Sequence, residues 1–239
     1  MTPYLLKDSG SKNQVKAWLA SALGVYAARC PLKWNDEDSL TECFFAAIST
    51  TLVTAAGRLD VDAYKIRGRG PRAPENRIGA DGIGIVHVDN PSTHLSGFFL
   101  FQAKKAHSQF DTLKHASAQC AKMLRYSPAS YLLALLPGQV NLVSAMAVAS
   151  VQGGDPSLNE VPFVSFPRFF VEHLLHGLML EHLSQLKATV APEIAAEIRH
   201  VLTIIGGRDD RARGVGVGEL LADLDFQFER LEPELTERR

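Results

Sequence analysis

Cysteine, unbalanced charge and long apolar runs are all scarce in this sequence, and each absence excludes a class of protein. The three cysteines, Cys30, Cys43 and Cys120, are odd in number and widely spaced, which fits neither a disulfide framework nor a zinc site. A reducing cytoplasm suits such a chain. No run reaches the roughly 18 apolar residues of a membrane span, and the first residues lack the apolar stretch of a signal peptide. We therefore expect a cytoplasmic protein with no membrane partner.

Charge of one sign is also missing, because the formal net charge is only −1. A protein that binds polyanions over its whole surface is usually strongly basic. Any surface that binds nucleic acid must therefore be a local patch. The 239 residues, 46% of them hydrophobic, are enough to bury a core and fit one large domain, or one domain with an appendage.

The spacing of apolar residues predicts helices at both ends of the chain and strands in the middle. Helices are predicted over residues 11–29 and 39–56, the second opening on a capping-box pattern at Ser39. Residues 62–80 are rich in Gly, Pro and Arg, which predicts a long loop or an irregular hairpin. Strands are then predicted over 82–88, 97–105, 131–136 and 140–148, with a helix over 108–125 between the second and the third.

The last third of the chain is predicted to be helical, over 167–187, 192–205 and 219–231. This order of elements indicates an α/β core over residues 1–150, with a helical C-terminal appendage over 151–239 that can belong to the same domain.

Polar residues with chemical potential stand at the ends of two predicted neighbouring strands. Asp81 opens the first strand, and Gln102-Ala103-Lys104 lies near the end of the second. Side chains alternate along a strand, so Gln102 and Lys104 share a face and can meet Asp81 if the strands pair. A carboxylate, an amide oxygen and the Ala103 carbonyl are hard ligands that suit Mg²⁺. The alternative is that residues 102–105 are only the solvent-exposed end of a strand.

The pattern of Asp81 followed by Gln102-Ala103-Lys104 resembles the motif of the PD-(D/E)xK nuclease superfamily. That motif is an Asp at the start of one strand and (Asp/Glu/Gln)-x-Lys in the next. The segments Gly-Ala-Asp-Gly and Phe-Gln-Ala-Lys are most similar to those of Mrr-type restriction nucleases and of nuclease subunits of bacterial anti-phage systems. The resemblance covers roughly residues 38–148, and it departs from the majority pattern at Gln102, where an acid is usual.

This resemblance implies a restriction-endonuclease-like core, in which a mixed central sheet is flanked by helices, and a site that uses Mg²⁺ or Mn²⁺. In such families the second strand is followed by a helix and two more strands. Many members also use a Glu from the helix before the strands, and Glu42 is then the candidate fourth catalytic and metal-binding residue. The alternatives are that Glu42 is a helix-capping residue and that Glu75 supplies the carboxylate.

Basic residues crowd the loop before Asp81. Such a loop beside a metal can hold phosphates, although an ordinary solvated loop explains the same composition. The residues predicted to bind nucleic acid are Arg67, Arg69, Arg72 and Arg77 of this loop, together with Lys105 at the end of the second predicted strand. Lys65 lies in the same loop.

Three functions remain open at this point. The first is a metal-dependent endonuclease of bacterial anti-phage defence that cuts double-stranded DNA, with RNA as the other possible polymer. The second is a nuclease-like fold kept as a non-catalytic binding or assembly module, and the third is an unrelated α/β enzyme with a chance motif. A protein partner or a homo-oligomer is expected, because no dedicated DNA reader is visible and apolar residues after position 160 spread around more than one helix face.

Overall fold

The computed structural model describes residues 9–33, 36–66, 78–90, 93–108, 110–151, 154–174 and 181–182. All of them belong to the first of two compact units, Met1–Leu183 and Ser184–Arg239. The predicted helices over 192–205 and 219–231 lie outside the described residues.

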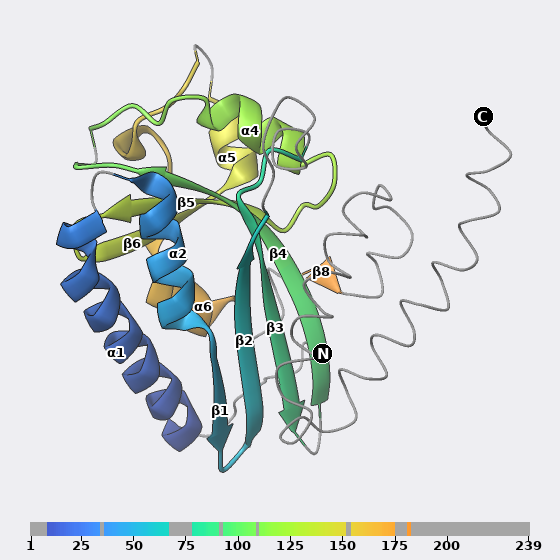
Figure 1. Ribbon diagram of the computed structural model, residues 1–239. Coiled ribbons are helices and arrows are strands. Elements are labelled where there is room, and N and C mark those ends of the chain that lie inside the picture. The colour runs from blue at the N-terminus through green and yellow to red at the C-terminus, as the bar shows by residue number, and fades with distance from the viewer. Residues whose placement is uncertain are drawn as a thin grey trace, which may run out of the picture. The chain divides into compact units, whose positions relative to one another are not determined.

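The described part of the chain combines helices and strands in an α/β fold, with two helices followed by four consecutive strands at its start (Figure 1). The N-terminal part comprises α1 (Ser9–Lys33), α2 (Glu37–Ile48), β1 (Thr50–Thr54), β2 (Gly57–Lys65), β3 (Gly82–Asn90) and β4 (Thr93–Lys105). After it come α4 (Ala116–Met123), β5 (Ser130–Leu136), β6 (Gln139–Ser144), α5 (Ala145–Ala149), a 3-10 helix (Leu158–Glu160), β7 (Phe163–Ser165), α6 (Phe166–Glu172) and β8 (Glu181–His182).

The strands form one mixed sheet in the order β1-β2-β3-β4-β5-β6-β7. Every neighbouring pair is antiparallel except β4 and β5, which are parallel. A parallel pair needs a crossover connection, and the chain supplies it through α4. The short strand β8 pairs with the first half of β4, at Gly97 and Phe98. The α/β class predicted from the sequence is therefore confirmed.

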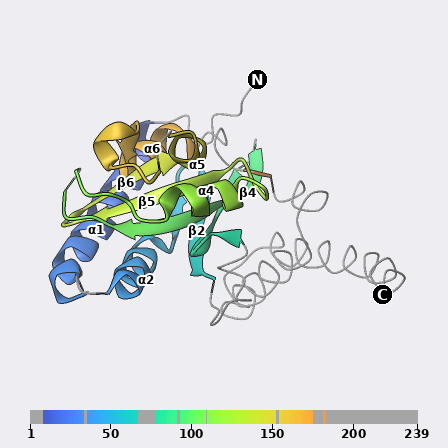
Figure 2. The same cartoon turned by 90° about the horizontal axis from the view of Figure 1, so that it is seen from above.

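The two faces of the sheet carry different helices. Alternate residues of β4, including Phe99 and Phe101, join one apolar cluster with α1, α2 and α6. Within it, the Phe101 ring lies 4.4 Å from that of Phe45 of α2, in an edge-on contact. The intervening residues of β4 face the other side, where α4 packs on β4 and β5, and α5 packs on α4. Figures 1 and 2 show α4 and α5 together, apart from α1 and α2.

The predicted helix over 39–56 is wrong in its last turns. Helix α2 ends at Ile48, and Thr50–Thr54 form β1, which a tight turn connects to β2. The strand residues are Thr, Thr, Leu, Val and Thr, and β-branched side chains favour a paired strand over a helix. Strand β2 also continues to Lys65, into the predicted loop over 62–80.

The second half of the predicted strand over 140–148 is also wrong. Strand β6 stops at Ser144, whose hydroxyl accepts a hydrogen bond from Met146 N and begins helix α5. The helix predicted from Ser108 begins only at Ala116, because the Asp111 carboxylate accepts hydrogen bonds from His107 N and Ser108 Oγ, a local pattern that competes with a helix. The helix predicted over 167–187 ends at Glu172, and residues 181–182 pair with β4.

The sequence predicts that residues 163–172 lie in the appendage, with the alternative that the appendage belongs to the core domain. They contribute β7 to the edge of the sheet and α6 to the apolar cluster, where Phe166, Phe169 and Phe170 are buried.

Candidate active site

The backbone of Asp81 is fixed where β3 begins. The ladder between β3 and β4 starts at the pair Gly82 and Phe101. One residue earlier, Asp81 N donates to Phe101 O at 2.9 Å, and Asp81 O accepts from Ile66 N at 2.7 Å. The residue is thus held between the end of β2 and the strand β4.

The Asp81 side chain contacts β4 at the predicted residues. Its Oδ2 accepts hydrogen bonds from Ala103 N at 2.8 Å and from Gln102 Nε2 at 2.5 Å. Asp81 is 8% exposed and Gln102 is 1% exposed, so this contact is shielded from water. The structure therefore brings together Asp81, Gln102 and Ala103. The contact also has a structural role, because it satisfies the amide of Ala103 beyond the end of the β3 ladder.

The turn before Asp81 depends on a glycine. Gly79 has φ +81°, and a Cβ built on it would lie 2.5 Å from the backbone oxygen of Gln119 in α4. Any side chain at this position would meet both a disfavoured backbone conformation and a helix backbone. The Gly-Ala-Asp sequence thus packs the turn tightly against α4, and this packing places Asp81.

Gln102 has an amide that is only half satisfied. Its Nε2 donates to Asp81 Oδ2 and, at 3.2 Å, to the carbonyl of Ala103. Within the described part of the chain, its Oε1 is buried and accepts no hydrogen bond. A buried acceptor without a partner costs about 1–3 kcal/mol and requires an explanation.

A divalent cation fits this set of groups. Rotation of the Gln102 amide exchanges Nε2 and Oε1, so that Oε1 would join Asp81 Oδ2 and the Ala103 carbonyl as an oxygen ligand. Three hard oxygens with one negative charge are a typical partial ligand set for Mg²⁺, which keeps several of its waters. In the described residues no cluster of three or more His, Cys, Asp or Glu residues is placed to hold a metal ion. Such a cation would therefore rely on one acidic ligand and on neutral oxygens.

Lys104 shares the Gln102 face of β4 and has a carboxylate partner. Its Nζ lies 3.8 Å from Glu37 Oε1, and its side chain is 14% exposed. The positive charge of Lys104 also reaches Cys120 on α4. Burial raises the pKa of the Cys120 thiol to about 12, against the opposing effect of Lys104. Cys120 is therefore protonated near neutral pH and is excluded as a nucleophile.

The structure places Glu37, and not Glu42, at the end of β4. Glu37 Oε2 accepts a hydrogen bond from Lys105 N at 2.8 Å, in addition to the ion pair with Lys104. Glu42 is exposed, and five residues of helix rotate it to a different side of α2. The sequence offered a signal for Glu37: Asp36 is the N-cap of α2, and its carboxylate accepts from Asp38 N and Ser39 N. Because the predicted helix has Ser39 as its cap, it begins after Glu37 and does not include this residue.

The basic loop is only partly described. Lys65 is the last residue of β2 and pairs with Asp38 at 2.8 Å, which adds a second link between the start of α2 and the sheet. Lys105 is half-buried at the end of β4. Arg67, Arg69, Arg72, Arg77 and the alternative ligand Glu75 lie outside the described residues. On α4, the Oε1 of Gln119 is buried without a hydrogen-bond partner among the residues described.

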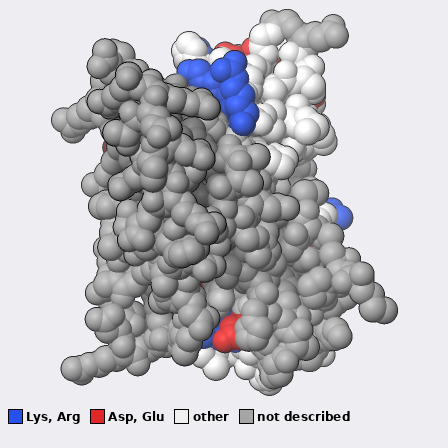
Figure 3. All heavy atoms as spheres, turned by 90° about the vertical axis from the view of Figure 1, so that its right-hand side faces the viewer, with Lys and Arg blue, Asp and Glu red and all other residues white. Residues whose placement is uncertain are grey.

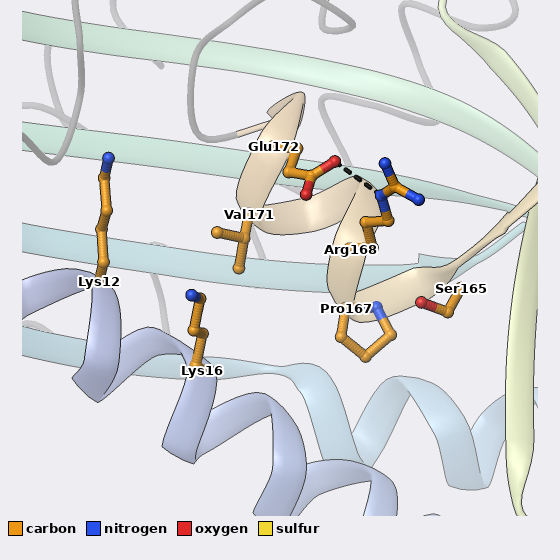
Figure 4. Close-up of a pocket in the computed structure, with 7 residues that line it drawn as sticks. All are labelled: Lys12, Lys16, Ser165, Pro167, Arg168, Val171 and Glu172. Atoms are coloured by element: carbon orange, nitrogen blue, oxygen red, sulfur yellow. Dashed lines mark hydrogen bonds and ion pairs between the residues drawn. The ribbon is translucent and has the colours of Figure 1, made fainter. Parts of the chain in front are cut away.

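A hollow of about 530 Å³ lies elsewhere, between α1 and α6. Figure 4 shows Lys12 and Lys16 rising from α1 on one side of the hollow, with Val171, Arg168 and Glu172 of α6 on the other. Arg168 and Glu172 form an ion pair of 2.8 Å, but both side chains are at least half exposed, and such pairs contribute little. None of the seven residues that line this hollow belongs to the Asp81 cluster.

Comparison with known proteins finds no family model, no curated protein and no solved structure that matches this chain. Among the helices that the structure describes, none combines the length and the apolar character needed to cross a membrane.

Proposed function

We propose that this chain is a metal-dependent nuclease that hydrolyses phosphodiester bonds, and that its substrate is DNA in a bacterial anti-phage defence system. The observation that carries the proposal is the buried contact of Asp81 with Gln102 and Ala103, which leaves one amide oxygen unsatisfied beside a carboxylate. Lys104 lies on the same face of β4 as Gln102.

The order of elements supports the same proposal. A helix that brings Glu37 to the end of β4 precedes the strands. Asp81 opens β3, Gln102-Ala103-Lys104 ends β4, and one helix and two further strands follow. This is the order that the resemblance to PD-(D/E)xK nucleases implies, and the choice of DNA and of defence rests on that resemblance alone.

Each residue has a distinct part in the proposed hydrolysis. When bound, Mg²⁺ would lower the pKa of a coordinated water and stabilise charge on the phosphate. Asp81 and Gln102 would hold the metal through their side-chain oxygens, and Ala103 through its carbonyl. Lys104 would orient the attacking water by donating a hydrogen bond to it. Glu37 would set the position of the Lys104 ammonium without contacting the substrate.

The first prediction is tested with the full chain, supercoiled plasmid DNA and a structured RNA, in Mg²⁺, in Mn²⁺ and in EDTA. We expect Asp81→Asn and Lys104→Ala to slow cleavage by at least about 100-fold, because each removes a charge that acts in the transition state. Asn is chosen over Ala at position 81 because it keeps an acceptor for Ala103 N.

Lys16→Ala, in the hollow of Figure 4, is the matched control for loss of a lysine, and it is expected to cut like the wild type. Circular dichroism spectra and Tm values establish that each variant is folded. Cleavage at the wild-type rate by folded Asp81→Asn would remove the site assignment.

A non-catalytic binding module is the second candidate, and one observation favours it. Asp81 Oδ2 already accepts two hydrogen bonds that the fold needs, so the residue has a structural reason to be present. The two candidates differ in the same assay. A module without catalysis gives no cleavage in either metal, and Lys104→Ala then changes nothing.

A further inference from the structure

Phe110 presents an aromatic ring to water. The residue is 68% exposed, and among the residues that the structure describes it is the only aromatic side chain with strong exposure. Among the described residues, the other large exposed apolar side chains are not aromatic and lie on other elements: Val25, Val53 and Met146. A single exposed apolar side chain is normal on a protein surface. A binding role for Phe110 therefore depends on the residues around it.

The turn that carries Phe110 is built by side-chain hydrogen bonds. The Asp111 carboxylate accepts from His107 N at 2.7 Å and from Ser108 Oγ at 2.8 Å. Ser108 Oγ in turn accepts from Phe110 N at 3.2 Å. The hydrogen bond from His107 N is the main reason that the pKa of Asp111 is lowered, so the carboxylate stays charged near neutral pH. Phe110 therefore stands on an ordered turn.

The far side of this loop is anchored as well. Leu113 N donates to Pro156 O at 2.9 Å, and Thr112 forms an isolated bridge with Ser157. His115 N donates to the Asp155 carboxylate. These contacts hold the loop against the segment that precedes β7, and the ring of Phe110 stays at the surface.

Basic residues flank the loop along the sequence of a chain that has almost no net charge, and the Asp155 carboxylate contacts the loop at His115. Residues 104–125 contain five Lys and Arg residues, and Asp111 is their one acid. Lys114 and Arg125 are exposed, and Lys122 is half-buried. Figure 3 shows one compact patch of Lys and Arg near the top of the face it draws, with a smaller area of Asp or Glu at its edge. Such a local patch attracts the phosphates of a nucleic acid.

The loop also starts at the candidate active site. Ala106 N donates to Leu135 O at 3.0 Å, so the pairing of β4 with β5 continues past Lys105 and the loop leaves directly from the end of β4. Phe110 follows Lys104 by six residues, a separation of at most about 20 Å for an extended chain. The ring and Lys104 therefore lie within the reach of one short nucleic-acid segment.

We infer that Phe110 stacks on an unpaired base of the substrate, and that this ring selects DNA with single-stranded character. Stacking on an aromatic ring is available to every base once it is out of the duplex, whereas a paired base hides both of its faces. The basic residues around the loop would hold the backbone on either side. This inference rests on the proposed function for its substrate class, but its binding arm is independent of any cleavage.

The test measures binding of a fluorescein-labelled 20-nucleotide single strand and of the matching blunt duplex, by anisotropy at low salt in EDTA. We expect the wild type to favour the single strand, and Phe110→Ala to weaken that binding between about 5-fold and 100-fold. Binding of the duplex should change by less than about twofold. Phe110→Trp should retain single-strand binding, and Phe110→Leu should behave like the Ala variant because it keeps apolar bulk without a π-face.

Val53→Ala, on β1, is the matched control for loss of an exposed apolar side chain, and it should bind like the wild type. Unchanged single-strand binding by Phe110→Ala, or equal losses for both DNA forms, overturns the inference and leaves a protein partner as the occupant of this ring. Plasmid cleavage by the same variants separates the two proposals. If Phe110 contributes to binding but no DNA is cleaved, only the proposed nuclease activity is contradicted. If DNA is cleaved and the Phe110 variants bind like the wild type, only the role of Phe110 is contradicted.

Discussion

At the scale of single residues, the choice of Gln at position 102 sets the charge of the Asp81 cluster. Its amide donates to the Asp81 carboxylate, whereas a carboxylate at the same place would repel it. Gln102 is 1% exposed, so water would screen such repulsion poorly. An amide at position 102 therefore keeps the Asp81 cluster at a single negative charge.

The second prediction concerns Gln102→Glu. In EDTA we expect the buried pair of acids to lower stability by roughly 2–3 kcal/mol, or about 5–10 °C in Tm. The added charge should also lower the Mg²⁺ concentration at the stabilisation midpoint on the order of tenfold. Thermal unfolding over a Mg²⁺ titration measures both effects, with Gln102→Leu as the control that removes the oxygen ligand. A Glu variant that Mg²⁺ stabilises no more than the wild type shows that residue 102 is not a ligand.

The sequence was sufficient to predict which residues of the two strands meet, and insufficient for the acid on the helix. Strand alternation and the position of Asp81 placed it opposite Gln102, because these depend only on a two-residue period. Glu37 depends on where α2 begins, and Asp36 and Ser39 are both acceptable caps by residue type. Only the packing of α2 on the sheet distinguishes them.

At the scale of elements, the first turn of α2 is what connects the helix to the end of β4. Asp36 caps this turn, and the side-chain hydrogen bond with Ser39 is the main reason that the pKa of the Asp36 carboxyl is lowered from its ordinary 3.8. The cap thus orders the turn from which Glu37 reaches Lys104 and Lys105.

The third prediction is that Asp36→Ala lowers Tm and slows any cleavage, whereas Asp36→Asn preserves both because Asn caps helices equally well. The folded pKa of this carboxyl is depressed, so its contribution is present above pH 3.8 and is lost as pH falls through the folded pKa. The gap in Tm between the wild type and the Ala variant should therefore shrink below that pH. Unfolding curves from pH 7 down to pH 2.5 measure it. A gap that is constant with pH shows that the charged cap does not stabilise the turn.

The elements that the sequence did not predict are mostly short, although strand β2, with nine residues, was also missed. Strand β1, helix α5 and strand β8 have five, five and two residues, and each is too brief for a helical or strand period to be recognised. Strand β1 was absorbed into the preceding helix because its identity depends on pairing with β2. The long strands β3 and β4 were found because their apolar runs are flanked by clear turn signals.

At the scale of the whole molecule, the structure weakens one reason to expect a protein partner and leaves two others unchanged. The apolar residues after position 160 suggested a covered surface, but Phe166, Phe169, Phe170 and Leu174 are buried in the described core. The net charge of −1 still gives no long-range attraction for a polyanion. The sequence still shows no dedicated DNA reader, so in the proposed function a partner would supply the targeting.

The fourth prediction is therefore that the purified chain alone cuts DNA slowly and depends on an assembly for full activity. Its mass in solution, from light scattering, and its plasmid cleavage rate at 50 mM and 200 mM salt test this. Because few phosphates are contacted, we expect both a low rate and a shallow salt dependence. A strictly monomeric chain that degrades plasmid rapidly in Mg²⁺, with no activator present, contradicts the prediction.

The pairing of β8 with β4 has a consequence for self-association. Strand β4 spans Thr93–Lys105, but its parallel partner β5 begins only opposite Leu100, so the earlier residues on that side have no partner in the main order of the sheet. Open strand edges of this kind are templates for the addition of another chain and for aggregation. The two residues of β8 cover this edge at Gly97 and Phe98. A short strand from later in the chain thus shields the most apolar part of β4 from edge-to-edge growth.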